Sequence, residues 1–186
     1  MNNKLLVLSD IHGNVPAIVA VLKWAAGELK GSDMTVFLGD GIRELSIAQQ
    51  QTGFSCEWKK VRGNNDDTPS TPESDILDFG GHRLFLCHGH RHALYSGYDR
   101  IIACARSMDA DAALFGHIHA PHLEDAGGLL LINPGSIGRA RSRAGETFAI
   151  IECMPQKPLA VHFWGIASDN VIQQLTSLQL TGINRV

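Results

Sequence analysis

The stretch from Lys4 to Asn14 reads KLLVLSDIHGN, and it sets the pattern that the first half of the chain repeats. Its apolar part, Lys4–Leu8, has the pattern of a short buried strand, and a polar turn carrying Asp10 and His12 follows directly. The next segment, Val15–Leu29, has a proline in its first turn and apolar residues at helical spacing. A strand, a polar loop and a helix in this order predict an α/β protein with chemistry-bearing side chains at the end of a strand.

Further elements follow along the chain. We expect strands at Met34–Leu38 and Trp58–Arg62 with a helix at Glu44–Gln51 between them, and two Gly-Gly hairpins that join Ile76–Phe79 to Arg83–Cys87 and Leu123–Ala126 to Leu129–Ile132. We also expect a helix at Gly97–Met108, strands at Ala112–Phe115, Thr147–Cys153 and Leu159–Trp164, and a C-terminal helix at Asp169–Leu180. Alternating strands and helices followed by hairpins predict a four-layer αββα sandwich, with two mixed β-sheets flanked by helices.

Composition narrows the class of protein. A chain of 186 residues is long enough for one core and short for two, so we expect a single domain over residues 1–186. No apolar run is long enough to cross a bilayer, so we expect no membrane contact. Four cysteines without paired spacing favour a reducing cytoplasm.

The net charge argues against binding to nucleic acid without sequence preference, although it does not exclude such binding. The net charge is −3, and a protein that holds a phosphate backbone without sequence preference needs clustered Lys and Arg. Only Arg139, Arg141 and Arg143 come close to such a cluster. They form either a small patch that faces phosphate or, as is commoner for such a run, a solvated basic loop.

The most informative polar residues come after the expected strands. They are Asp10, His12, Asp40, Asn64, His88, His117 and His119. Strand ends in α/β sheets are rigid and adjoin solvent-facing loops, so side chains there can converge on one site. This mixture of oxygen and nitrogen donors suits manganese, iron or zinc better than magnesium alone.

Seven donors are too many for one tetrahedral ion. Two ions that share one carboxylate explain the number, and such pairs sit about 3.5–4 Å apart to clamp a phosphoryl group. Two divalent ions bring more positive charge than Asp10 and Asp40 neutralise. The remaining positive charge lowers the pKa of bound water and attracts an anionic substrate.

Simpler readings apply to single residues. A lone histidine is more often a core or surface residue than a ligand, and Asp or Asn after a strand is often a helix cap, which is our interpretation of Asn14. His92 and His122 either line the substrate cleft or are exposed loop residues, and we expect the exposed loop. Asp66 is a candidate for orienting a ligand histidine. The joint pattern of the seven donors nevertheless favours the metal site.

The ordered motifs resemble those of the calcineurin-like metallophosphoesterases, in particular their small single-domain phosphodiesterase branch. The matching segments are Asp10-Ile11-His12-Gly13-Asn14, Gly39-Asp40, Gly63-Asn64-Asn65-Asp66, His88-Gly89-His90, Gly116-His117-Ile118-His119 and Asn133-Pro134-Gly135-Ser136. The resemblance implies that Asp10, His12 and His119 hold one metal and that Asn64, His88 and His117 hold the other, with Asp40 as the bridge. It also implies a metal-bridging hydroxide as nucleophile and a small phosphoester as substrate.

Three further expectations follow from the resemblance. Manganese is the metal we expect, with zinc, iron and nickel as alternatives, and because members of the branch often form homo-oligomers we expect a homodimer. Larger relatives carry histidine at the position of Asn65, and an amide cannot act as a general acid, so His90 becomes the candidate acid and diesters with good leaving groups the preferred substrates. The alternatives are a non-catalytic scaffold, like the similar retromer subunit with its degraded metal site, and a nuclease or cyclic-nucleotide phosphodiesterase.

Overall fold

The computed structural model describes residues 3–30, 33–167 and 169–175, which form two mixed β-sheets. One sheet has the order β11 (Ile172–Gln174), β10 (Ala160–Ile166), β9 (Glu146–Cys153), β1 (Asn3–Leu8), β2 (Met34–Phe37) and β3 (Glu57–Lys60). The other has the order β4 (Ser74–Phe79), β5 (His82–Cys87), β6 (Ala112–Phe115), β8 (Leu130–Pro134) and β7 (Pro121–Asp125). Strands β1, β2 and β3 run parallel in the first sheet, and β5, β6 and β8 run parallel in the second.

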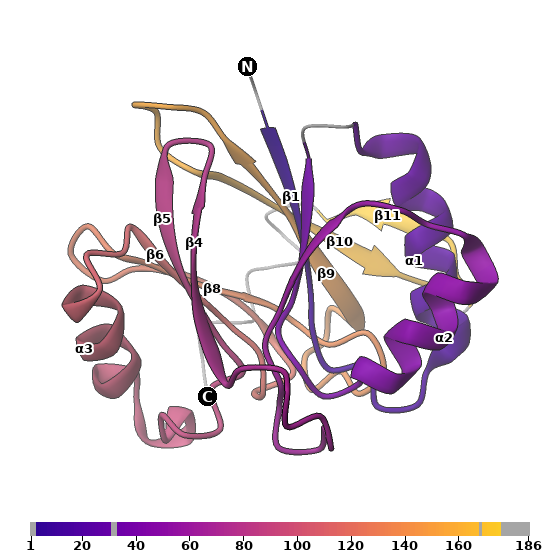
Figure 1. The fold of residues 1–186 in the computed structure, drawn as a ribbon, viewed down its shortest axis with the longest axis horizontal. Coiled ribbons are helices and arrows are strands. Elements are labelled where there is room, and N and C mark those ends of the chain that lie inside the picture. Colours follow the sequence, from indigo (N-terminus) through magenta and orange to yellow (C-terminus); the bar gives the residue numbers. More distant parts are fainter. Residues whose placement is uncertain (1–2, 31–32, 168, 176–186) are drawn as a thin grey trace.

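Helices cover the outer face of each sheet, which makes four layers (Figure 1). Helices α1 (Val15–Glu28) and α2 (Ile42–Thr52) pack on the first sheet, and α3 (Asp99–Ser107) packs on the second. A short 3₁₀ helix, η1 (Leu94–Ser96), precedes α3. This arrangement confirms the predicted αββα sandwich.

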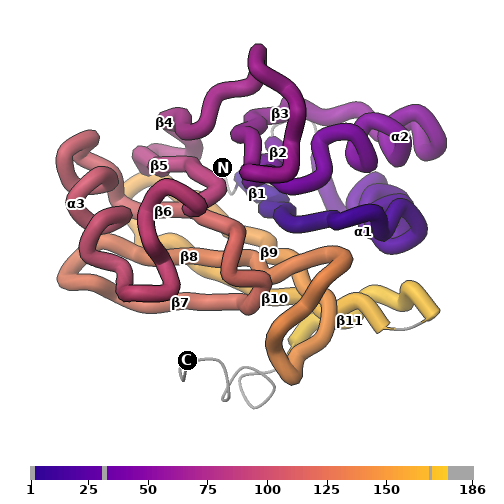
Figure 2. Tube along the Cα trace, turned by 90° about the horizontal axis from the view of Figure 1, so that it is seen from below, coloured from indigo at the N-terminus to yellow at the C-terminus, as the bar shows by residue number. Residues whose placement is uncertain are grey.

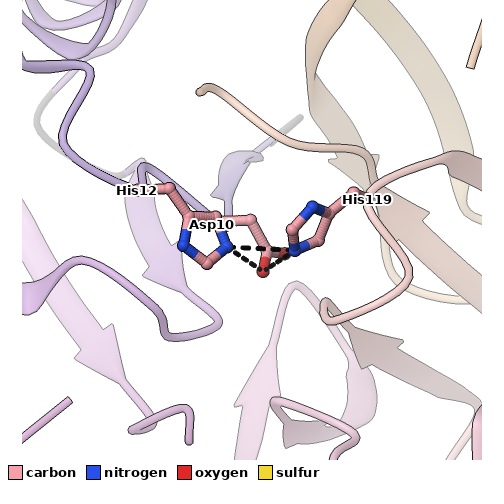
Figure 3. A group of neighbouring side chains, drawn as sticks. All are labelled: Asp10, His12 and His119. Carbon is pink, nitrogen blue, oxygen red and sulfur yellow. Dashed lines mark hydrogen bonds and ion pairs between the residues drawn. The ribbon is translucent and has the colours of Figure 1, made fainter. Parts of the chain in front are cut away.

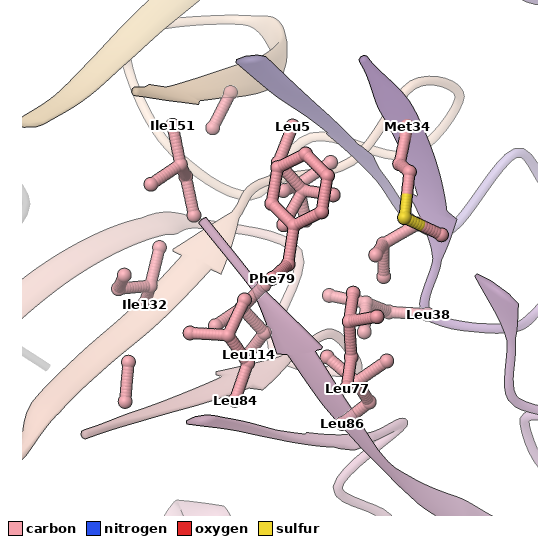
Figure 4. Packing of buried hydrophobic residues seen from close by; sticks show 14 of the residues in the cluster. Leu5, Met34, Leu38, Leu77, Phe79, Leu84, Leu86, Leu114, Ile132 and Ile151 are labelled. Atoms are coloured by element: carbon pink, nitrogen blue, oxygen red, sulfur yellow. The ribbon is translucent and has the colours of Figure 1, made fainter. Parts of the chain in front are cut away.

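The main core lies between the two sheets (Figure 4). Leu5 of the first sheet and Leu84 and Leu114 of the second are completely buried there. Burying one such side chain stabilises the fold by about 1.5–3 kcal/mol. The contact between the two inner faces therefore holds the sheets, and the loops at their ends, in a fixed relation.

The parallel strands bring the predicted site residues to one edge of the sandwich. In the first sheet Leu8 pairs with Phe37, and in the second Cys87 pairs with Phe115, so each pair of strands ends at the same level. The loops that carry the polar motifs begin at these ends. Figure 2 views the molecule from this edge.

The predicted C-terminal helix is wrong where the structure describes it. Residues Ile172–Gln174 form strand β11, which pairs antiparallel with β10, while residues 176–180 of the expected helix lie outside the described residues. Asn170 has a left-handed backbone (φ 62°), and Ala167 N–H donates to the Val171 carbonyl at 2.9 Å. The polar residues Asp169 and Asn170 thus make a hairpin turn, and they do not begin a helix.

Two smaller differences concern helices. Helix α2 begins two residues earlier than expected, and the expected helix over 97–108 begins only at Asp99, after the unexpected η1. The cap predicted for α1 is confirmed, since the Asn14 side chain accepts a hydrogen bond from Ala17 N–H. Within the described residues, no helix combines the length and the apolar character that a membrane span requires.

Candidate metal centre

Backbone strain marks the predicted ligands. Nine non-glycine residues in the described part of the chain have positive φ, and five of them are predicted ligands: Asp10 (55°), His12 (43°), Asp40 (60°), His117 (70°) and His119 (58°). A left-handed conformation costs a non-glycine residue about 1–3 kcal/mol, and such residues cluster at functional sites. The fold therefore keeps several strained residues together at one edge.

The first group of donor atoms consists of Asp10, His12 and His119 (Figure 3). The Nε2 atoms of His12 and His119 face each other at 3.0 Å. Asp10 Oδ1 lies 3.1 Å from His119 Nε2 and 3.5 Å from His12 Nε2. Loops that are 107 residues apart in the sequence thus place two imidazoles and a carboxylate around one point.

A second group adjoins the first and consists of Asp10, Asp40 and His88. Asp40 Oδ2 lies 3.4 Å from His88 Nε2 and 3.6 Å from His12 Nε2. The two groups share Asp10, and Asp40 contacts a histidine of each. Either carboxylate is therefore positioned between the two groups.

Hydrogen bonds fix the tautomer of two histidines. His88 Nδ1 donates to the Leu38 carbonyl and His119 Nδ1 donates to the Arg139 carbonyl, each at 2.8 Å. A neutral imidazole whose Nδ1 carries the proton has a free lone pair on Nε2. Histidines that bind metal ions are commonly oriented in this way.

Two buried atoms of the two donor groups lack a hydrogen-bond partner among the described residues. They are Asp10 Oδ1 and His88 Nε2, and both belong to the donor groups. Leaving a buried polar atom unsatisfied costs about 1–3 kcal/mol. A divalent cation between the groups would satisfy both, so the residues present fit metal ions.

The carboxylates are held in their charged form. Burial alone raises the pKa of Asp10, but the neighbouring imidazoles of His119 and His12 outweigh it and lower that pKa below its ordinary value. Burial likewise raises the pKa of Asp40, while His88 and Asn65 lower it further than burial raises it. Both groups are therefore ready to bind a cation at neutral pH.

Comparison with known proteins shows the family of the chain. A family model described as the calcineurin-like phosphoesterase superfamily domain matches residues 4–155. The chain belongs to the calcineurin-like phosphoesterase superfamily. This confirms the resemblance that the motifs indicated.

Two relatives and one solved structure illustrate the range of similarity to this chain. A probable metallophosphoesterase of Mycoplasma pneumoniae is 34% identical over 137 residues, which are 72% of this chain and 79% of the relative. Phosphodiesterase YfcE of Escherichia coli K12 is 30% identical over 169 residues, covering 80% of this chain and 87% of that protein. The structure of wild-type Vps29 from Entamoeba histolytica in complex with Zn²⁺ has a TM-score of 0.73 at 20% identity and covers 92% of this chain and 97% of that one.

Glycines let the phosphoesterase loops approach the carboxylates. A Cβ atom on Gly63 would collide with Asp40 Oδ1, and one on Gly116 would collide with the Ser9 hydroxyl and crowd Asp10 Oδ2. No larger residue fits either position without moving a candidate ligand.

Asp66 fixes the loop that carries Asp40, which corrects the prediction that it orients a histidine. Its Oδ2 accepts hydrogen bonds from Asp40 N–H (2.7 Å) and Gly63 N–H (2.9 Å). Its Oδ1 accepts from Gly41 N–H and Ile42 N–H, both at 2.9 Å. These donors include free N–H groups at the start of α2, so a distant carboxylate caps that helix. The sequence gives no local signal for this contact, because the partners are 24 to 26 residues apart.

The segment from Asn133 to Ser136 ties together the loops that carry Asp10 and His117. Asn133 Nδ2 donates to the Gly116 carbonyl at 2.7 Å, and the Ser136 hydroxyl donates to the Asp10 carbonyl at 2.8 Å. Both side chains are completely buried. The motif is therefore part of the framework of the site.

The other predicted site residues lie at different distances from the donor groups. The His117 ring packs beside His88, with 5.1 Å between ring centroids, and its backbone N–H donates to Asp10 Oδ2 at 3.0 Å. His90 also lies beside His88, at 5.5 Å between centroids, and burial together with the His88 charge lowers the pKa of His90. Asn64 is exposed on the loop that follows β3.

Asn65 occupies a place beside Asp40 that the sequence did not indicate. Its backbone N–H donates to Asp40 Oδ1 at 2.8 Å, and its side-chain amide donates to Asp40 Oδ2 at 2.6 Å. The residue that replaces the usual histidine thus supports a candidate ligand carboxylate.

The expectation of an exposed loop is wrong for His122. This residue lies in β7 and is only 8% exposed, with its ring 4.7 Å from that of Tyr98 between centroids. His92 is half-buried and packs against Phe85. The pattern missed β7 at this point because a single histidine after a proline carries no strand periodicity.

Proposed function

We propose that this protein is a phosphodiesterase that uses two divalent metal ions, with manganese as the first candidate and zinc, iron and nickel as alternatives. The observation that carries the proposal is the pair of adjacent donor groups at one edge, with Asp10 in both. The superfamily assignment and the name of the relative YfcE support a phosphoesterase reaction.

We assign the metal-holding roles as follows. Asp10, His12 and His119 would hold one ion, His88 and His117 would hold the other together with Asn64, and Asp40 would bridge them. Asn64 is exposed on the loop that follows β3, and Asn65 keeps Asp40 oriented. When bound, such ions activate water and neutralise charge that develops on the phosphoryl oxygens.

His90 is the proposed proton donor to the leaving group. Its ring lies beside His88 and His117, at 5.5 Å and 6.4 Å between centroids, so it borders the second donor group. Its Nδ1 is buried without a hydrogen-bond partner among the described residues. Because the Asn65 amide does not replace a histidine acid, we expect diesters with good leaving groups to react best.

The alternative of a non-catalytic scaffold is disfavoured by the donor set. Every residue type that the metal site requires is present in this sequence, and five of the predicted ligands lie in the two donor groups.

The four cysteines are free in the structure, which supports our further proposal of a reducing cytoplasmic location.

The test is hydrolysis of bis(p-nitrophenyl) phosphate and p-nitrophenyl phosphate by metal-stripped protein, with Mn, Zn, Fe, Ni and Mg added back separately. We expect metal-dependent cleavage that favours the diester, and at least about a hundredfold loss in Asp40→Asn. Asp67→Asn is the matched control, since Asp67 is an exposed aspartate on the neighbouring loop after β3. Full activity of Asp40→Asn would refute the assignment of Asp40, and inactivity with every metal would favour the scaffold.

A further inference from the structure

A cavity of about 820 Å³ adjoins the metal centre and plays no part in the function proposed above. It is bounded by the segment Leu94–Tyr98, by residues from Ile118 to Glu124 and by Arg141. This volume is in the range of small-molecule binding sites, which is about 300–1,000 Å³.

The cavity and the metal centre share one loop. From His117 to Ala120 the side chains alternate: His117 and His119 belong to the metal centre, whereas Ile118 and Ala120 line the cavity. A molecule bound in the cavity would therefore contact residues that are direct sequence neighbours of the predicted ligands.

Tyr95 and Arg141 join the two at the mouth of the cavity. The Tyr95 hydroxyl donates to the His117 carbonyl at 3.2 Å, and Arg141 Nη1 donates to the Tyr95 hydroxyl at 2.6 Å. The Arg141 backbone N–H donates to the His119 carbonyl at 2.9 Å. A cationic side chain and an aromatic ring are thus fixed between the cavity and the place where a phosphate would bind.

The segment that presents Tyr95 is strained and exposed. Ala93, directly before η1, has a left-handed backbone (φ 52°), although it is neither glycine, Asn nor Asp. Tyr95 is 61% exposed, and its ring lies 5.5 Å from that of His117 between centroids. Strain that holds an aromatic ring in solvent costs free energy, and it is typical of ligand-binding segments.

The lining matches a planar group with a hydrogen-bonding edge. Tyr98 and His122 place aromatic rings along the cavity, and Ile118 adds apolar surface. The Glu124 carboxylate accepts a hydrogen bond from His122 Nε2 at 3.2 Å and provides a polar end. Aromatic walls with a few polar groups are the features that bind nucleobases by stacking and edge contacts.

We propose that this cavity binds the nucleoside group of a phosphodiester substrate, with Tyr95 stacking on the base and Arg141 contacting the phosphate. The proposal rests on the phosphodiesterase function and names the substrate class of that site. It makes Tyr95, Ser96 and Arg141 residues that determine specificity.

Two substrates with one leaving group test the proposal: thymidine 5′-(p-nitrophenyl phosphate) and methyl p-nitrophenyl phosphate. Because both release p-nitrophenol, the ratio of their kcat/KM values measures how strongly the enzyme prefers the thymidine group over the methyl group on the phosphate. We expect the wild type to prefer the thymidine ester by about tenfold or more, the size of one base–aromatic contact. Tyr95→Ala and Ser96→Trp, which fills the cavity from an exposed position, should reduce the ratio toward one, whereas Tyr95→Phe should retain it.

A wild-type ratio near one, or a ratio unchanged by Ser96→Trp and Tyr95→Ala, would overturn the proposal while leaving the phosphodiesterase function intact. If neither ester is hydrolysed with any metal, the proposed function fails. A binding measurement then tests separately whether the cavity holds a nucleoside group. Calorimetry would then compare thymidine 5′-monophosphate with ribose 5-phosphate. Tighter binding of the nucleotide that is lost in Ser96→Trp supports the cavity site, and equal binding of the two refutes it.

Discussion

Replacement of Asp66 by Asn should loosen the loop that carries Asp40. The Asp66 carboxylate accepts four backbone hydrogen bonds, two on each oxygen. An asparagine keeps one acceptor oxygen and turns its NH₂ toward two N–H donors, so two hydrogen bonds to a charged acceptor are lost. Each contributes about 1.5–3 kcal/mol. Since Asp66 is only half-buried, we take the lower end and expect a loss of about 3 kcal/mol in the free energy of unfolding.

Thermal unfolding and metal titration measure this effect. For a chain of this length, a loss of about 3 kcal/mol corresponds to a decrease of roughly 6–12 °C in Tm. Displacement of Asp40 should also weaken Mn²⁺ binding by about 10–100-fold in calorimetry, as is typical for residues that support metal ligands. Asp67→Asn changes the same chemistry at an exposed neighbour and should match the wild type in both assays. If Asp66→Asn behaves like this control, the role assigned to Asp66 is wrong.

Two other perturbations follow from the structure. Gly63→Ala should lower metal affinity, and it should lower the free energy of unfolding by about 1–3 kcal/mol, because the new methyl group collides with Asp40. Gly27→Ala in α1 is the control, since its methyl group meets no atom within 4 Å and should be neutral or stabilising. Calorimetry and urea unfolding measure both variants. Burial lowers the pKa of His122 below 6.5. The unfolded chain therefore binds more protons as the pH falls through that value, and stability should drop between about pH 7 and about pH 5 by more in the wild type than in His122→Phe. Urea unfolding at both pH values measures the effect. If the wild type and His122→Phe lose the same stability between the two pH values, this assignment is wrong.

The sequence predicts most of the layers because their periodicity is local. Apolar runs such as Leu5–Leu8 and Ala112–Phe115 are buried on both faces, and the polar residues shortly after each one mark the strand end. Parallel pairing then brings these ends together, and five of the residues that the sequence singled out lie in the two donor groups; their division between two ions is what the family resemblance implies. The contacts that hold those ligands could not be predicted from the sequence, because Asp66 and Asn133 bind backbone atoms that are far from them along the chain.

The errors also have local physical causes. The segment after β10 has polar residues that fit either a helix start or a turn, and pairing of Ile166 with Ile172 selects the hairpin. His122 is buried because the rings of Tyr98 and Phe115 surround it, which no spacing in the sequence reveals. Single polar residues are ambiguous in sequence, and tertiary contacts decide their roles.

The number of metal ions bound per chain tests the two-metal site most directly. Wild-type protein equilibrated with Mn²⁺ and passed through a desalting column should retain two ions per chain by inductively coupled plasma mass spectrometry. His12→Ala should retain one, because the group of Asp40 and His88 remains. One ion or none in the wild type, across manganese, zinc, iron and nickel, would contradict the binuclear centre.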